Sequence, residues 1–449
     1  MCRPYRPEIR GTIHNPVLTP GLLCYAPTGL AGALKNRFFE HPTLQGLQVA
    51  PSPIRPLSRS ACLFLWPSCF AFSKLIIKFA RDTKALKTME HATKALSGLK
   101  KEDFQKVING KETDLFFLTN DNGMEVAITN YGGSIVAIMV PDRDGNVANV
   151  IQGHDNIDDC INSPEPFLST LVGRYGNRIC KGCFTLNGKE YHLAINNGPN
   201  HLHGGPTGFH ARVWDAEQIN ERSLVLRYVS AYYEEGFPGE LSMTVMYSLS
   251  DDNELKIDYK GTTNKKTVVN MTSHGFFSLA GIANPTPSAE NVICQINADF
   301  YIPIDENSIP TGEIRSVKGT PFDFTEPHAV GERIDADDEQ IKNGAGYDHC
   351  FVLNKREPGE LTFAAKITEP VSGRTMEVYT TEPGVQFYSD NWADGYKGQH
   401  GATFPRRSAL CFEAQHFPDS PNRAYFPPVV LKPGQVYTQK TIYKFGVAE

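Results

Sequence analysis

Short segments in which apolar and polar side chains alternate recur along the chain beyond its first hundred residues. The segments 124–128, 243–249 and 255–259 all show this period of two. Such alternation is typical of β-strands with one buried face. Turn-forming sequences separate the segments, and Asn187-Gly188 in particular is a strong signal for a two-residue hairpin turn. The pattern predicts an all-β fold.

Strands of this kind are expected to build one large domain over residues 99–449. Long amphipathic helices are hard to find there, and only 335–342 has the pattern of a short turn of helix. Repeats, heptads and clear linkers are also lacking in the sequence. The prediction is a large antiparallel β-sandwich, whose concave face can hold a ligand on side chains from several strands.

The first 88 residues differ in composition from the rest. They hold 12 Lys and Arg against 3 Asp and Glu, whereas the whole chain holds 44 against 50, so the remainder carries a formal charge of −15. Their apolar run at 60–73 is too short to span a membrane and lies too far from Met1 for a signal peptide. Because the sequence that begins at Met89 is a credible start for a soluble protein, residues 1–88 are interpreted as a disordered or mistranslated extension.

Cysteine content and net charge restrict the class of protein. Ten cysteines in 449 residues do not indicate a disulfide framework, which favours a reduced, cytoplasmic protein. Cys180 and Cys183 form a lone CxxC without a second Cys or His pair at zinc spacing, so no metal or redox role is predicted for it. The formal charge of −6 gives no support for a nucleic-acid partner, and no membrane partner is expected.

Two titratable residues stand in largely uncharged segments. Glu413 lies in the strand-like run 409–419, and His274 lies in the apolar run 270–281. A buried acid is costly unless a site uses its charge. A carboxylate base and a histidine acid are sufficient to move protons on a neutral, hydroxyl-rich substrate. This pairing predicts a sugar-modifying enzyme.

Polar residues in four other segments could complete such a site. Arg174 and Arg178 flank Asn177, and an arginine offers planar donors to sugar oxygens, although surface ion pairs are an equal alternative. In an extended strand, His201 and His203 would point to the same face. That spacing also suits a metal, but no Asp, Glu or Cys follows at metal spacing, so hydrogen bonding to a polar ligand is favoured.

The remaining two segments each place one polar residue in an apolar run. Asp348 follows Gly346-Tyr347 and could instead cap a turn, whereas Gln386 is flanked by aromatic residues that suit the apolar faces of sugars. Each of the four segments is weak evidence when it is taken alone.

Together, in their order along the chain, these residues resemble the aldose 1-epimerases, also called galactose mutarotases. The resemblance covers roughly residues 99–449, and it rests on the sequences GRYGNRI, NHLHGG, SHGFFSLAG, YDH, PGVQFYSDN and LCFEAQHFPDSPN. It implies the galactose mutarotase-like supersandwich and interconversion of the α and β anomers of free aldohexoses, such as galactose and glucose. It further implies that no cofactor or metal is needed. A monomer is expected on other grounds, as the default for a closed β domain of this size.

The resemblance also implies a role for each matching residue. Glu413 would remove the proton of the anomeric hydroxyl as the general base, and His274 would protonate the ring oxygen as the general acid. The residues implied in substrate binding are Asn177, Arg178, His203, Phe276, Asp348 and Gln386. Gly275-Phe276 departs from the Ser-Tyr of many relatives, which removes two hydroxyls near His274 and bears on substrate preference.

Three other functions stay open on the residues alone. A glycosidase would use Asp348 and Glu413 as its two carboxylates, but it would leave His274 without a task. A carbohydrate-binding module on the same scaffold would tolerate the loss of both Glu413 and His274. A hexose-6-phosphate 1-epimerase would need a cationic grip on phosphate, and no obvious Arg/Lys cluster is present in the acidic body of the chain.

Overall fold

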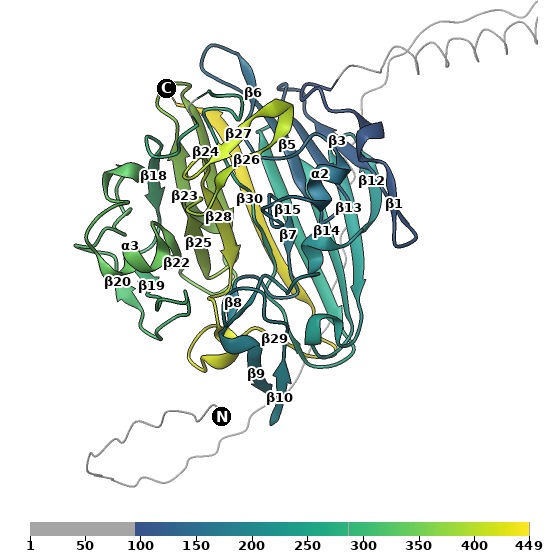
Figure 1. Ribbon diagram of the computed structural model, residues 1–449, viewed down its shortest axis with the longest axis vertical. Helices are drawn as coiled ribbons and strands as arrows, with labels where there is room; N and C mark the ends of the chain where they lie inside the picture. Colours follow the sequence, from purple (N-terminus) through teal and green to yellow (C-terminus); the bar gives the residue numbers. More distant parts are fainter. Residues whose placement is uncertain (1–94, 286, 449) are drawn as a thin grey trace, which may run out of the picture. The chain divides into compact units, whose positions relative to one another are not determined.

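β-Strands make up most of the regular structure of this protein (Figure 1). The computed structural model describes residues 95–285 and 287–448, which lie in the second of two units of the chain, Lys87–Glu449. The interpretation of residues 1–88 lies outside the described residues. In the described ranges, α2 (Ile157–Ile161) and α3 (Glu339–Gly344) are short α-helices, and neither is long and apolar enough to cross a membrane.

The largest sheet has nine strands and runs through the whole domain. Every pair of neighbouring strands in it is antiparallel. In spatial order its strands are β12 (Asp215–Asn220), β13 (Ser223–Ser230), β14 (Leu241–Leu249), β15 (Glu254–Thr263), β30 (Tyr437–Val447), β24 (Arg374–Thr380), β23 (Thr362–Thr368), β18 (Ile293–Ile296) and β21 (His328–Ala329).

A five-stranded antiparallel sheet packs against the nine-stranded one. Its strands are β20 (Arg315–Ser316), β19 (Phe300–Ile302), β22 (Asp348–Val352), β25 (Gly384–Tyr388) and β28 (Cys411–Gln415). The Tyr443 hydroxyl of β30 donates a hydrogen bond of 3.2 Å to the Phe412 carbonyl of β28, and aromatic side chains of both sheets belong to one buried core. The two sheets therefore form a sandwich, as the alternating pattern predicted.

Smaller elements surround this sandwich. A four-stranded sheet consists of β3 (Leu115–Thr119), β4 (Glu125–Thr129), β5 (Ile135–Pro141) and β6 (Val147–Asn149). The two-stranded pairs are β1 (Lys106–Ile108) with β2 (Lys111–Thr113), β7 (Leu171–Val172) with β17 (Thr272–Ser273), β8 (Arg178–Ile179) with β11 (His201–Leu202), β9 (Cys183–Leu186) with β10 (Lys189–His192), β16 (Thr267–Val268) with β29 (Val430–Leu431), and β26 (Asp394–Lys397) with β27 (Thr403–Pro405).

Seven short 3₁₀ turns are found in the described ranges. They are η1 (Lys101–Phe104), η2 (Cys180–Gly182), η3 (Phe209–Ala211), η4 (Glu234–Gly236), η5 (Val330–Glu332), η6 (Gln399–Gly401) and η7 (Ser420–Asn422). Together with α2 and α3 they join strands and add no helical layer to the sandwich.

The local predictions agree with the structure at most positions. Strand β14 alternates between buried and more exposed residues along its whole length. The predicted hairpin is formed by β9 and β10, and Asn187 and Gly188 have φ values of 51° and 74°, as a two-residue turn of this kind requires. Strand β4 differs, because both of its faces are buried. Ala127 belongs to a second buried cluster with Phe104, which covers the face expected to meet solvent.

Phe387 tests how strongly the aromatic layer between the sheets stabilises the fold. Its ring lies 5.1 Å from the ring of Phe412 and 5.3 Å from that of Tyr347, and its side chain is fully buried. We expect Phe387→Ala to lower the free energy of unfolding by about 3–5 kcal/mol, because it leaves a cavity. Urea denaturation measures this, with Val371→Ala as the control, since Val371 is 86% exposed and should change stability by under about 0.5 kcal/mol. Equal effects of both substitutions would contradict the expectation.

Candidate active site

Three neighbouring strands of the five-stranded sheet place polar side chains on one face. Gln386 in β25 stands opposite Glu413 in β28 and opposite Cys350 in β22, and Asp348 lies two residues before Cys350. Since side chains two residues apart share a face, all three polar groups point the same way. The alternate residues, such as Phe387, belong to the core between the sheets. The sheet register thus brings together residues that are 65 positions apart in sequence.

His274 reaches the same place from a different part of the chain. It follows β17, and its backbone N–H donates to the Thr170 carbonyl at 2.9 Å. Its ring stacks on Phe276 at 4.9 Å, and its Nε2 lies 3.5 Å from Oε1 of Glu413. Both His274 and Glu413 are buried. The carboxylate and the imidazole paired on sequence grounds therefore face each other.

His203 completes a group of rings beside this pair. Its ring lies 5.1 Å from that of His274, and its Nδ1 accepts a hydrogen bond from the backbone N–H of Asn177 at 3.1 Å. In the neutral ring, the proton is consequently on Nε2. The next residue must be glycine, because Gly204 has a φ of +84° and a Cβ there would lie 1.9 Å from the Gly173 oxygen.

Arg178 and Asp348 form the opposite side of the site. Nη1 of Arg178 lies 3.6 Å from Oδ2 of Asp348, and Nε of Arg178 donates to Oδ1 of Asn197 at 3.0 Å. Nε2 of Gln386 donates to Oδ1 of Asp348 at 2.7 Å. Both oxygens of Asp348 are therefore engaged, which holds the arginine and the carboxylate in fixed positions.

These side chains line one cavity of about 450 Å³, a size within the range of small-molecule sites. Six of the eight predicted site residues border it: Asn177, Arg178, His203, His274, Asp348 and Glu413. Phe276 and Gln386 are not among the lining residues. Phe276 lies behind His274, and Gln386 contacts the cavity residue Asp348.

Two residues that the sequence offered as site residues, Arg174 and His201, do not line the cavity and form hydrogen bonds within the fold instead. The Arg174 guanidinium donates to the carbonyls of Pro238 and Gly239 at 2.9 and 2.8 Å, and burial lowers the pKa of Arg174 to about 10. His201 donates from Nδ1 to the Ala194 carbonyl at 2.8 Å. It does not share a face with His203, because the strand ends at Leu202 and His203 has a positive φ of 50°.

Burial shifts both members of the central pair toward their uncharged forms. Desolvation and then the negative charge of Asp348 raise the pKa of Glu413 well above its usual range, against the opposing effect of Arg178. Desolvation lowers the pKa of His274 to about 4. Oε2 of Glu413 and Nδ1 of His274 are buried without a hydrogen-bond partner among the described residues. Such a site suits a polar, uncharged ligand whose hydroxyls form hydrogen bonds there.

His203, His274 and Glu413 must also be considered as metal ligands. One donor atom from each lies within 4.8 Å of the others. However, Nδ1 of His203 accepts the N–H of Asn177, so Nε2 keeps its proton in the neutral ring and has no lone pair to offer a metal. The hydrogen-bonding pattern therefore favours a hydroxyl-bearing ligand over a metal ion here.

The family is decided by a match that covers most of the chain. The family model described as aldose 1-epimerase matches residues 114–444, which include every residue of the cavity. The chain belongs to the aldose 1-epimerase family.

Individual relatives in this family are similar over nearly their whole length. Galactose mutarotase from Bos taurus is 43% identical over 333 residues, which are 74% of this chain and 94% of that protein. Aldose 1-epimerase from Escherichia coli is 36% identical over 339 residues, or 75% of this chain and 96% of that protein. A crystal structure of an aldose epimerase homologue from C. elegans has a TM-score of 0.69 at 26% identity and covers 75% of this chain and 100% of that one.

Several cavity residues of this aldose 1-epimerase family member were not predicted from the sequence. Glu165 accepts the backbone N–H of Phe167 at 3.0 Å, and burial raises the pKa of Glu165 to about 7. The ring of Phe167 lies 4.7 Å from that of His203. Trp392 also lines the cavity although it is 70% exposed. Only Trp392 had a usable signal, because a tryptophan just after the PGVQFYSDN segment is a candidate for stacking on a sugar.

Removing the charge of Asp348 tests the electrostatic account of the site. Because the negative Asp348 raises the pKa of Glu413, Asp348→Asn should lower that pKa. The substitution also breaks the ion pair between Asp348 and Arg178, and the positive charge of Arg178 lowers the pKa of Glu413 as well. Infrared titration of the protonated carboxyl band, assigned with Glu413→Gln, measures the change. Asp337→Asn on an exposed carboxylate is the control. An unchanged Glu413 titration in Asp348→Asn would contradict this account.

Proposed function

We propose that this chain is an aldose 1-epimerase that interconverts the α and β anomers of free aldohexoses such as galactose and glucose. The observation that carries the proposal is the buried pair of Glu413 and His274, whose Oε1 and Nε2 are 3.5 Å apart at the cavity. Membership of the family supports the reaction type. Only protons are transferred, so the reaction as proposed needs no cofactor or metal.

The two residues act on two oxygens that are attached to the same sugar carbon. Glu413 removes the proton of the anomeric hydroxyl while His274 donates a proton to the ring oxygen, and the C1–O5 bond breaks. Rotation about C1–C2 then presents the other face of the aldehyde. Closure with the proton transfers reversed yields the opposite anomer.

The pair needs one proton in total for this cycle. Ionised Glu413 with protonated His274 opens the ring, and the products of opening are protonated Glu413 and neutral His274. Those products are also the form that closure requires. Burial favours the uncharged form of each group, so the state after ring opening costs little. Ring opening converts the first state of the pair into the second, and closure restores the first.

The remaining cavity residues are proposed to hold the sugar. Arg178 and Asp348 offer a donor and an acceptor to neighbouring sugar oxygens, and Nε2–H of His203 donates into the cavity. Asn177 lines the cavity, while Gln386 positions Asp348. Phe276 is proposed to support the His274 ring by stacking on it, and not to contact the substrate directly.

A phosphorylated sugar is the second candidate substrate, and the cavity disfavours it. Among the described residues that line the cavity, Arg178 is the only Lys or Arg, and it is already paired with Asp348. A phosphate dianion generally requires several cationic or N–H donors. A glycosidase is disfavoured because its two carboxylates would leave the buried His274, whose Nε2 lies 3.5 Å from Glu413, without a task.

We also propose that the protein works as a monomer in the cytoplasm. One chain supplies every residue that lines the cavity, so the site needs no second copy. Light scattering of the purified protein would test the oligomeric state, and imaging of the tagged full-length chain would test its location.

Polarimetry of freshly dissolved α-D-galactose and α-D-glucose tests the reaction and its base. We expect Glu413→Gln to keep the shape of the site and to reduce the rate about 10²–10⁴-fold, the usual contribution of a general acid–base group. Glu382→Gln is a matched control, because Glu382 is also buried and paired with a histidine, 2.6 Å from Nδ1 of His416, but does not line the cavity.

Each result of this experiment has a definite reading. Acceleration by the wild type and by Glu382→Gln, but not by Glu413→Gln, supports the proposal. A near-normal rate in Glu413→Gln would refute the role of Glu413. Failure of the wild type on both sugars, followed by activity on glucose 6-phosphate, would replace the proposed substrate, and failure on all three would favour a binding module.

The pH dependence of the rate tests the shared proton. Because the pair must hold one proton, we expect a bell-shaped profile that falls when both groups are protonated and again when neither is, with limbs that belong to the pair. In His274→Asn, the much lower residual rate should keep the acidic limb from Glu413 and lose the alkaline limb. A wild-type rate without an alkaline limb would contradict the acid role of His274.

A further inference from the structure

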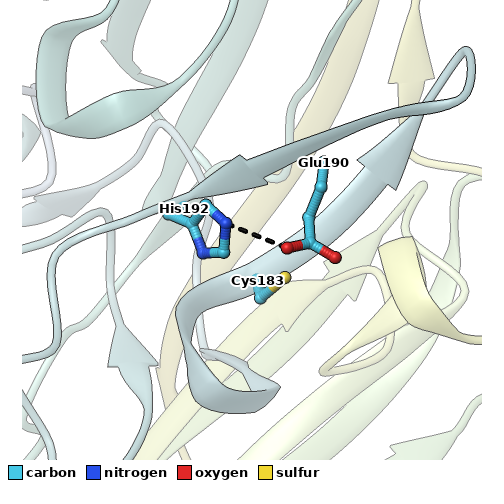
Figure 2. A group of neighbouring side chains, drawn as sticks. All are labelled: Cys183, Glu190 and His192. Carbon is cyan, nitrogen blue, oxygen red and sulfur yellow. Dashed lines mark ion pairs between the residues drawn. The ribbon is translucent and has the colours of Figure 1, made fainter. Parts of the chain in front are cut away.

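A second group of potential metal ligands lies on the β9–β10 hairpin. Figure 2 shows Cys183 on β9 with Glu190 and His192 on β10. Their donor atoms all lie within 4.8 Å of one another. Cys183 is half-buried, while Glu190 and His192 are exposed, so the group is open to ions from solvent.

The hairpin register explains why the three side chains meet. The two-residue turn pairs Cys183 directly with His192, which puts their side chains on the same face of the ribbon. Glu190 precedes His192 by two residues and therefore shares that face. The carboxylate already contacts the imidazole, with Oε1 of Glu190 2.9 Å from Nε2 of His192. This ion pair holds two of the three donors near each other.

The set of donors selects the type of ion. A thiolate, an imidazole and a carboxylate are all zinc ligands, with bonds of about 2.0–2.3 Å. A tetrahedral ion with such bonds keeps its ligands roughly 3.3–3.8 Å apart, so small side-chain rotations bring these atoms into range. Mg²⁺ prefers oxygen ligands and does not match a sulfur donor.

We propose that Cys183, Glu190 and His192 bind one zinc ion, with water as the fourth ligand. Binding displaces the thiol proton to solvent, leaves the one proton of neutral His192 on Nδ1 so that Nε2 can bind, and replaces the Glu190–His192 contact with two metal bonds. The ion then links the two strands at the open end of the hairpin. From there the chain leads to two cavity residues, Arg178 before Cys183 and Asn197 after His192, which are themselves joined by a hydrogen bond of 3.0 Å. The zinc ion would therefore hold together the two ends of the hairpin that connect to Arg178 and Asn197.

Cobalt titration of the reduced, full-length protein tests the proposal, because a cobalt–thiolate bond gives a charge-transfer absorption in the ultraviolet. We expect the wild type to show this band with one Co²⁺ per chain, and Zn²⁺, but not Mg²⁺, to displace it. Cys183→Ser should abolish the band, and His192→Asn should weaken binding by at least about tenfold. Cys180→Ser is the matched control and should leave the band unchanged. The cluster of His203, His274 and Glu413 contains no sulfur and cannot produce the band.

Three results would overturn the proposal: no band in the wild type, a band that survives in Cys183→Ser, or unchanged affinity in His192→Asn. The second result would place the metal on other cysteines of the chain. Polarimetry with galactose on the same variants shows that they remain folded, because neither Cys183 nor His192 lines the cavity. Should the chain have no mutarotase activity, thermal unfolding replaces polarimetry, so this test does not depend on the proposed function.

Discussion

A buried carboxylate that faces a buried imidazole sets the main requirement on this structure. Glu413 and His274 are both buried, and removing charges from water costs several kcal/mol per ion. The surrounding structure must therefore hold both groups rigidly and supply polar contacts from fixed positions. The adjacent strands β25 and β28 hold Glu413 in position, because their other face is anchored in the aromatic core by Phe387 and Phe412.

The same requirement extends outward from the pair. Asp348 raises the pKa of Glu413, and it is held in place by Gln386 and Arg178. Residues that only contact the cavity pair thus affect the protonation of Glu413, the residue proposed as the general base. A cavity whose one arginine is already paired with Asp348, and whose buried Glu413 is shifted toward its uncharged form, suits a neutral sugar, since such a ligand brings hydroxyls but no net charge.

The sequence was sufficient to predict much of the fold and most of the site. Alternation along β14 and the Asn187-Gly188 turn predicted strands and a hairpin at their observed places. Motif resemblance selected the six predicted residues that line the cavity. Prediction was wrong at two positions, where additional residues cover a strand face that was expected to be exposed, and where a positive φ interrupts an expected strand. Strand β4 is covered on its second face by a further hydrophobic cluster. The positive φ of His203 turns its side chain away from the face on which His201 lies.

By itself, the sequence determined the strand pattern, the turn chemistry and which residue types were available for catalysis, because these depend on neighbours in the chain. Only the tertiary structure decided which of them meet. Register across β22, β25 and β28 joins Asp348 to Glu413, and packing separates Arg174 from Arg178. The hairpin likewise carries Cys183 to His192, although their spacing along the chain resembles no zinc motif. Distances between side chains follow from strand pairing and packing, and linear spacing does not report them.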